Sequence, residues 1–318
     1  MASKLTWTRY AADYVLRQKC GPYRKKTYTK RINVSNDEAS ERLASLLCGD
    51  KPFAAGRMGL FEAAVMRMYE FKKKNKYALT MDNLYNCAGF FPNDIDLGDE
   101  FNRVTKDALS QMDILAANKQ LCENYFINTC GAPDLVVAEN LGLFDVCMIK
   151  HSWSHALAGK KVLVVTSFPK SVEQQYVKRE KLFVGTDILP EFASLETYQA
   201  LMTVGDLRDE RFATWFEALD FMKREILARD FDVCLLGCGA YGFPLAAEIK
   251  KAGRQAIHMG GSLQILFGIM GKRWDGTREG GELHIREDIA PYYNENWTYP
   301  IEEKPTEASK VEYGPYWK

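Results

Sequence analysis

The sequence lacks any excess of charge of one sign, since 42 lysines and arginines balance 42 aspartates and glutamates. This balance gives no indication of a nucleic-acid partner or an anionic membrane. No apolar run approaches the length of a membrane span, and the first residues, MASKLTWTRY, have no signal-peptide core. We therefore expect a cytoplasmic protein without a transmembrane segment.

The cysteines and histidines show no arrangement typical of a disulfide framework, a zinc site or a covalent nucleophile. The eight cysteines are scattered without a CxxC pair, which favours reduced and mostly buried thiols. His151 and His155 are four residues apart, but the Ser-Trp-Ser between them predicts a loop and no third ligand stands nearby. The sequence also has no Gly-x-Ser-x-Gly elbow and no Cys–His signature.

The sequence does contain an alternation of strand-like and helix-like segments. Its 318 residues, 47% of them hydrophobic, suffice for a large core. The expected strands are 52–57, 135–138, 161–167, 195–204, 233–236 and 255–259, and the expected helices are 35–48, 59–76, 101–124, 171–183 and 209–229. This alternation predicts an α/β fold: a mostly parallel Rossmann-like sheet with helices on both faces and a helical N-terminal portion.

We divide the chain into three parts. Residues 1–50 are a basic arm, irregular apart from one short helix as far as residue 33, followed by a second helix that a capping box opens. Residues 51–290 are the α/β domain, and residues 291–318 are an aromatic C-terminal tail packed on it. The tail aromatics either cover an apolar surface, which we favour, or form a stacking platform for sugars.

Three loops are expected on one rim of the sheet, because ligands of parallel sheets bind beyond the carboxyl ends of the strands. These loops follow Ala55, Thr166 and Leu236. Ser167 and Lys170 belong to the second loop, where they either contact a substrate or pack as an ordinary strand-to-helix connection.

The third loop is rich in glycine and precedes a helix. Gly237, Gly239 and Gly242 match GxGxxG, and Gly260-Gly261 forms a second glycine turn after the next strand. Glycines in this context let backbone amides approach a phosphate. An NAD site also needs an acid near the end of the next strand, where this chain has His258. We therefore favour a phosphate or nucleotide site without NAD geometry over an NAD site or purely structural glycines.

Two further clusters place cations near the same rim. Arg57 ends a strand and Glu62 lies in the first turns of the next helix. Arginine holds diphosphate oxygens bidentately, and a nearby carboxylate binds a metal, orients a hydroxyl or acts as a base; the alternative is an ordinary ion pair. Gly271-Lys-Arg-Trp274 follows an apolar helix, where it either neutralises a diphosphate and stacks on a base or sugar, or decorates a helix C-terminus.

The blocks around Arg57 and His258 resemble the GT-D type of glycosyltransferase. That family has an early Arg-Phe-Gly-Asp-Gly-Glu block, which stands here as Arg57-Met-Gly-Leu-Phe-Glu62, and a late Gln-Ala-Ile-Asp-Ile-Gly strand, which stands as Gln255-Ala-Ile-His-Met-Gly260. Of the family's Asp–Glu pair, tied to metal and sugar nucleotide, only Glu62 is present, because position 60 is Leu. Residues 50–318 also look like uncharacterised proteins of bacterial polysaccharide-biosynthesis clusters, in which GAYG, AIH-Gly-Gly, GKRW and a final Tyr-Trp recur.

The resemblance implies a hexosyl- or pentosyltransferase that moves a sugar from a nucleoside-diphosphate donor, of UDP or GDP type, to a glycan, lipid-linked or other acceptor hydroxyl. Arg57 and Glu62 are the expected catalytic residues, with Glu62 also the candidate ligand of Mn²⁺ or Mg²⁺. The expected substrate-binding residues are Gly59, Ser167, Lys170, Gly237, Gly239, Ala240, Tyr241, Gly242, His258, Gly260, Gly261, Lys272, Arg273 and Trp274. The alternatives are an NAD(P)-dependent oxidoreductase and a non-catalytic sugar-nucleotide-binding protein. We expect no NAD and no nucleic acid, and leave a homodimer open.

Overall fold

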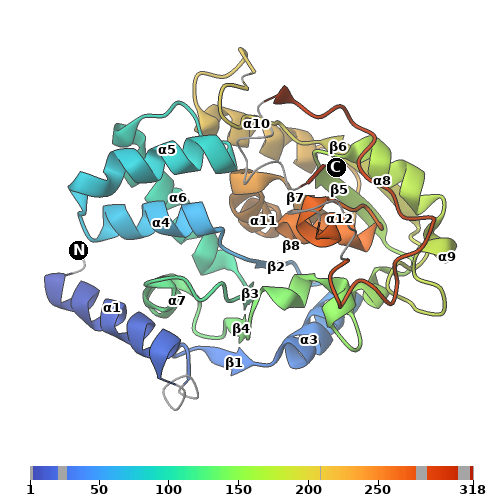
Figure 1. Cartoon of the computed structure of the whole chain (residues 1–318), viewed down its shortest axis with the longest axis horizontal. Helices are drawn as coiled ribbons and strands as arrows, with labels where there is room; N and C mark the ends of the chain where they lie inside the picture. The colour runs from blue at the N-terminus through green and yellow to red at the C-terminus, as the bar shows by residue number, and fades with distance from the viewer. Residues whose placement is uncertain (1–2, 21–26, 208, 277–284, 307–315, 318) are drawn as a thin grey trace.

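The computed structural model describes residues 3–20, 27–207, 209–276, 285–306 and 316–317. At its centre is one eight-stranded sheet, in which every strand pairing is parallel (Figure 1). The strands are β1 (Ile32–Val34), β2 (Phe53–Gly56), β3 (Ile114–Ala116), β4 (Val136–Ala138), β5 (Lys161–Thr166), β6 (Ser194–Gln199), β7 (Val233–Gly237) and β8 (Gln255–His258). Their order across the sheet is β1-β4-β3-β2-β8-β7-β5-β6, so β2 and β8 are neighbours at the centre.

Helices cover both faces of this sheet and bury a hydrophobic core on each side. One core is formed with α4 (Leu60–Glu70), α5 (Tyr77–Ala88), α6 (Gly98–Gln111), α7 (Glu123–Cys130), α10 (Trp215–Leu227) and α11 (Gly242–Lys251). The other is formed with α3 (Asn36–Cys48), α8 (Pro169–Tyr176), α9 (Arg179–Leu182), α12 (Leu263–Leu266) and α13 (Lys272–Asp275). The predicted α/β class, with a parallel sheet covered on both faces, is confirmed.

The strands are continuously apolar because both of their faces are buried. In β5, Val162 and Val164 belong to one core, whereas Leu163 and Val165 belong to the other. Successive side chains of a strand point to opposite faces, so a strand between two helical layers needs no polar alternation. This is why the apolar runs at 161–167, 233–236 and 255–259 could be identified as strands from sequence.

The predicted helix over 101–124 is wrong. Helix α6 ends at Gln111, and the chain then forms β3 and turns into α7. The apolar side chains of Leu109, Met112 and Leu115 match a helical period, but a strand of only three residues fits inside that pattern without breaking it. Asp113 fixes the switch, because its backbone N–H donates to the Ala54 carbonyl at 2.8 Å and its carboxylate accepts the Ala54 N–H at 2.9 Å.

The N-terminal portion is more helical than expected. Instead of a short helix, α1 (Lys4–Lys19) has 16 residues, begins at an N-cap formed by Ser3 and packs through Trp7 on Phe71, with ring centroids 5.2 Å apart. Residues 21–26 of the predicted arm lie outside the described part of the chain. The predicted helix over 59–76 ends at Glu70, and α5 was not expected.

The C-terminal segment packs on the α/β body. Ile289 and Trp297 are buried in the core on the α8 side, and Ile269 forms a bridge with Thr298. Trp317 packs on Phe168, with ring centroids 4.9 Å apart. Tyr313, another of the tail aromatics, lies outside the described residues. None of the helices that the structure describes is both long and apolar enough to cross a bilayer.

Candidate functional site

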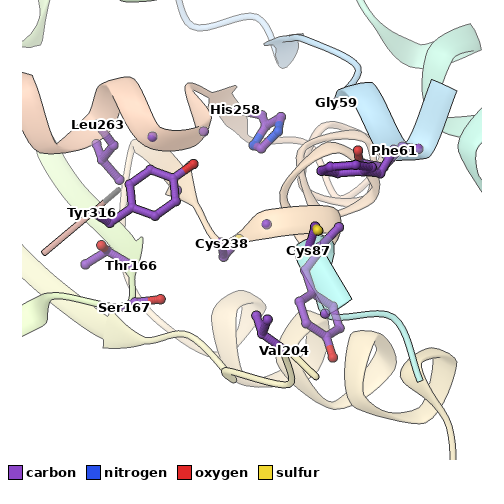
Figure 2. Close-up of a pocket in the computed structure, with 18 of the residues that line it drawn as sticks. Gly59, Phe61, Cys87, Thr166, Ser167, Val204, Cys238, His258, Leu263 and Tyr316 are labelled. Carbon is purple, nitrogen blue, oxygen red and sulfur yellow. The ribbon is translucent and has the colours of Figure 1, made fainter. Parts of the chain in front are cut away.

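A cavity of about 300 Å³ opens at the carboxyl ends of the strands (Figure 2). It is lined by the segments that follow β2, β3, β5, β6, β7 and β8, together with the end of α5 and the C-terminal Tyr316 and Trp317. From β2 the sheet grows in one direction through β3 and β4, and on the other side β7 and β8 lead back toward β2. The strand order therefore reverses between β2 and β8, and the cavity lies at this topological switch point. The prediction that the three loops converge on one rim is confirmed.

The structure brings most of the predicted site residues to this cavity. Those that line it are Arg57, Gly59, Glu62, Ser167, Gly237, Gly239, Tyr241, His258, Gly260, Gly261 and Arg273. The predicted residues that are not among its lining are Lys170, Ala240, Gly242, Lys272 and Trp274. Lys170 is exposed on α8, and Trp274 is buried in the core. Whether any of these residues binds a substrate stays a prediction.

Arg57 presents a cation to the cavity without a counter-charge. Within the described part of the chain, no carboxylate lies within ion-pair distance of its guanidinium, and its buried Nε has no hydrogen-bond partner. The guanidinium lies against Gly260, where a Cβ would be 2.9 Å from Nε. Gly260 also has φ of +61°, a conformation that favours glycine. A half-buried arginine that has no carboxylate partner among the described residues is suited to bind an anion in the cavity.

Glu62 is the only carboxylate among the described residues that line the cavity. It lies in the first turn of α4, whose N-cap is Gly59, so its charge is favourable near the positive end of the helix. Its carboxylate is folded over Gly59, where a Cβ would lie 2.0 Å from Oε2. Glycine at position 59 therefore holds open the space that the carboxylate occupies.

His258 ends β8 at the back of the cavity and is 4% exposed. Burial, and to a smaller extent the positive charge of Arg57, lowers the pKa of His258 to about 3. The imidazole is therefore neutral at physiological pH. It packs against Gly242, where a Cβ would be 2.1 Å from Nδ1. The position at which an NAD site would hold an acid is thus filled by a neutral, buried ring.

The glycine loop combines packing requirements with exposed backbone. A Cβ at Gly237 would lie 2.7 Å from Leu263, so the absence of a side chain there serves packing. Gly239 is exposed and has φ of +57°, and with it begins a 3₁₀ turn (Gly239–Tyr241) that leads directly into α11. Close packing explains why positions 237 and 242 are glycine. Gly239 instead lies on the cavity wall, at the start of a helix.

The segment Gly271–Trp274 does not end an apolar helix, as one interpretation of its sequence had it. Gly271 is instead the N-cap of α13, and the cations lie in the helix itself. Arg273 reaches the cavity and donates from Nη1 to the hydroxyl of Tyr316 at 3.2 Å. The backbone N–H of the adjacent Lys272 donates to the carbonyl of Trp317 at 3.1 Å.

Several residues of the cavity were not foreseen as site residues: Phe61, Asn118, Gln120, Thr203 and Tyr316. Figure 2 shows Phe61 and Tyr316 on opposite sides of the cavity, with His258 between them at its upper edge. Asn118 and Gln120 follow β3 and would have been found if β3 had been recognised as a strand. Tyr316 was considered only as part of the aromatic tail, where its distance along the chain gave no signal of its position.

The described residues contain no group of three or more His, Cys, Asp or Glu side chains that could hold a metal ion. Mg²⁺ at a nucleotide site is commonly held by one or two carboxylates plus the substrate's phosphates, and Glu62 supplies one carboxylate. Such an ion would neutralise charge on the diphosphate when bound. The need for Mn²⁺ or Mg²⁺ stays a prediction.

Comparison with known proteins gives a likeness of fold. No protein-family model matches the chain, and no curated protein matches it in sequence. One similar solved structure is a selenomethionine-substituted domain of unknown function 1792 (DUF1792), with 12% identity and a TM-score of 0.43. A second, described as showing that the highly conserved domain of unknown function 1792 has a distinct glycosyltransferase fold, has 13% identity and a TM-score of 0.42. Each match covers 89% of this chain and 95% of the other.

Proposed function

We propose that this protein is a glycosyltransferase that moves a sugar from a nucleoside-diphosphate sugar to an acceptor hydroxyl. The observation that carries the proposal is the Arg57 guanidinium, which has no carboxylate partner among the described residues and faces a cavity at the switch point of a parallel sheet. Exposed backbone at Gly239 borders the same cavity, and Glu62 is the one carboxylate among the described residues that line it. This set of groups fits an anionic leaving group next to a reacting hydroxyl.

The proposed reaction needs two kinds of assistance, and the cavity offers candidates for both. The acceptor oxygen forms a bond to the anomeric carbon while the bond from that carbon to the diphosphate oxygen breaks, and the nucleoside diphosphate leaves with the electron pair. Arg57 and the amides of the glycine loop stabilise the charge that grows on the diphosphate. Glu62 accepts the proton of the acceptor hydroxyl. Arg273, at the cavity edge, adds a second cation.

The rival oxidoreductase function receives less support from the cavity. An NAD site uses a carboxylate at the end of the strand that follows the glycine loop, to bind the ribose hydroxyls. Here that strand is β8, and it ends in the neutral His258. The third possibility, a non-catalytic binding protein, shares the same cavity and differs only in turnover.

Nucleotide binding and donor turnover together test the proposal. We expect UDP or GDP, and not NAD, to raise the unfolding temperature, with and without Mn²⁺ as the two arms of the screen. Arg57→Gln should weaken binding of that nucleotide about tenfold to a hundredfold, because an ionic hydrogen bond is worth roughly 1.5–3 kcal/mol. Stabilisation by NAD alone would contradict the transferase, and nucleotide binding without donor turnover would favour the binding protein.

The role of Glu62 can be tested without touching its own side chain. A methyl group at position 59 would collide with the carboxylate, so Gly59→Ala should displace Glu62 from its place. We expect nucleotide affinity to be kept and turnover to fall about a hundredfold or more, as for Glu62→Gln. Gly49→Ala is the matched control, because a Cβ there would meet nothing closer than 3.6 Å. Full activity of Gly59→Ala would exclude Glu62 as the base.

A further inference from the structure

The net charge of the chain is zero, but the positive and negative residues are unevenly distributed along the sequence. Residues 1–33 contain nine cations and a single acid, Asp13, so the rest of the chain is acidic by the same amount. The nine cations are Lys4, Arg9, Arg17, Lys19, Arg24, Lys25, Lys26, Lys30 and Arg31. The balance of 42 against 42 therefore does not hold for the N-terminal part of the sequence, and a cluster of cations of this density attracts polyanions.

Helix α1 exposes three aliphatic side chains among its cations. The most exposed large apolar side chains of α1 are Leu5, Val15 and Leu16, with exposed fractions of 79%, 48% and 42%. At 100° per residue these three side chains and the exposed Lys4, Arg9 and Lys19 all project from one half of the helix, which we call the outer face of α1 (Lys4, Leu5, Arg9, Val15, Leu16 and Lys19).

No acid neutralises this outer face. Within the part of the chain that the structure describes, Lys4, Arg9 and Lys19 have no ion-pair partner. The one acid of α1, Asp13, lies one turn after Arg9 at the edge of this face, and its carboxylate is bound to Arg17 at 2.8 Å. In Figure 1, α1 lies along the periphery of the molecule, at the edge of the sheet that β1 forms, and the side chains of its outer face are exposed.

The aromatic residues of α1 point the other way. The ring of Trp7 packs on Phe71, and the ring of Tyr10 packs on Tyr125 with centroids 5.3 Å apart. Single-stranded nucleic acids are bound by stacking bases on exposed aromatic rings, which the outer face does not offer. Exposed aliphatic side chains beside cations instead suit an anionic membrane interface, where the aliphatics enter the acyl boundary and the cations meet lipid phosphates.

We propose that the outer face of α1 docks on the surface of a bilayer that contains anionic lipids. Leu5, Val15 and Leu16 enter the boundary between head groups and acyl chains, while Lys4, Arg9 and Lys19 contact lipid phosphates. The helix is already packed on the body through Trp7 and Tyr10, so docking needs no refolding. The proposal is independent of the proposed enzymatic function, since it uses no residue of the cavity.

Co-sedimentation with lipid vesicles tests this docking. The full chain should bind vesicles of mixed phosphatidylglycerol and phosphatidylcholine, should not bind pure phosphatidylcholine, and should be released by salt. The variant Lys4→Glu/Arg9→Glu/Lys19→Glu should bind roughly a hundredfold more weakly, from about 1 kcal/mol for each cation. Lys51→Glu/Lys150→Glu/Lys181→Glu is the matched control, because it changes the net charge equally at exposed lysines outside α1. That control should keep its affinity.

A second variant separates the contribution of the aliphatic side chains to vesicle binding from that of the cations. Leu5→Ser/Leu16→Ser keeps every cation and should weaken vesicle binding at least tenfold, since two aliphatic side chains no longer leave water. All variants change exposed residues, and their thermal unfolding should match that of the parent chain. Absence of binding to anionic vesicles, equal loss of binding by the control, or binding of single-stranded oligonucleotides instead would each overturn the proposal.

Discussion

At the scale of single residues, the charge of Arg57 contributes to the neutral state of His258. The guanidinium lacks a carboxylate partner among the described residues, and its charge adds to burial in keeping the neighbouring imidazole neutral. A neutral ring leaves the full positive charge of Arg57 available to the cavity. An acid in place of His258 would form an ion pair with Arg57 and remove the charge that an anionic ligand needs.

The neutral state of His258 predicts a loss of stability in mild acid. Its pKa is about 3 in the folded chain and 6.5 in the unfolded reference, so only the unfolded chain gains this proton as pH falls from 6.5 toward 3. The free energy of unfolding should therefore decrease by roughly 1–2 kcal/mol between pH 6.5 and 5 through this residue alone.

Urea unfolding of the parent chain and of His258→Asn at both pH values measures this contribution. The asparagine cannot gain a proton, so the pH dependence of its unfolding free energy should be smaller by about that amount, whatever its absolute stability. His155→Asn, at an exposed histidine, is the control. Equal slopes for the parent and His258→Asn would show that the ring is protonated in the folded chain.

Residues of the site could be predicted from the sequence where they follow or end a strand that is recognisable as an apolar run. Arg57, Ser167 and Gly237 follow or end strands that are apolar on both faces, and each was expected on the rim where it is found. Tyr316 could not be placed, because no local pattern connects it with strands that end more than 50 residues earlier. Trp274 was expected to face a ligand, but its bulk fills the core.

At the scale of elements, the segment after β3 depends on one buried carboxylate. Glu123 is 1% exposed and accepts the backbone N–H groups of Asn118 at 3.0 Å and Gln120 at 3.3 Å. It also accepts the hydroxyl of Tyr28 at 2.8 Å. Asn118 in turn donates to the carbonyl of Met58 at 3.2 Å, so the carboxylate connects two walls of the cavity.

Replacing this carboxylate by an amide should loosen the cavity wall. In Glu123→Gln one oxygen becomes a donor facing other donors, so at least one bond is lost and we expect a destabilisation of about 1–3 kcal/mol. Nucleotide affinity should fall together with stability, because Asn118 and Gln120 move. Urea unfolding and titration calorimetry with the nucleotide measure the two effects.

Tyr28→Phe is the matched control for Glu123→Gln. It removes only the phenol hydroxyl, leaves both backbone bonds to the carboxylate, and should cost roughly 1 kcal/mol with no change in nucleotide affinity. If the two variants changed affinity equally, Glu123 would act on stability alone. The segment was absent from the sequence prediction, because the three residues of β3 are too few to interrupt the helical spacing that precedes them.

At the scale of the whole molecule, the cavity is closed by the far end of the chain. The carbonyl of Tyr316 accepts from Gln264 Nε2 at 3.2 Å, and its ring lies against Gly261, where a Cβ would be 2.7 Å from the ring. The loops after β2, β7 and β8 form the other walls. The site is thus complete only when residues near both 57 and 316 are in place.

This dependence predicts that Tyr316 contributes to donor binding and little to folding. Tyr316→Ala should weaken nucleotide or donor affinity about tenfold, from an aromatic contact worth roughly 1–3 kcal/mol. Tyr316→Phe keeps the ring and loses only the hydroxyl bonded to Arg273, so it should keep most of the affinity. Titration calorimetry for affinity and thermal unfolding for stability separate the two contributions.

Tyr292→Ala supplies the matched comparison, because it removes another half-buried tail aromatic, one that packs on Phe183 and does not line the cavity. It should lower the unfolding temperature without changing donor affinity. Equal weakening of donor binding by Tyr292→Ala and Tyr316→Ala would mean that the tail acts only through global stability. Selective weakening by Tyr316→Ala would make the end of the chain a wall of the donor site, because a tail that merely covered the fold would show no such difference.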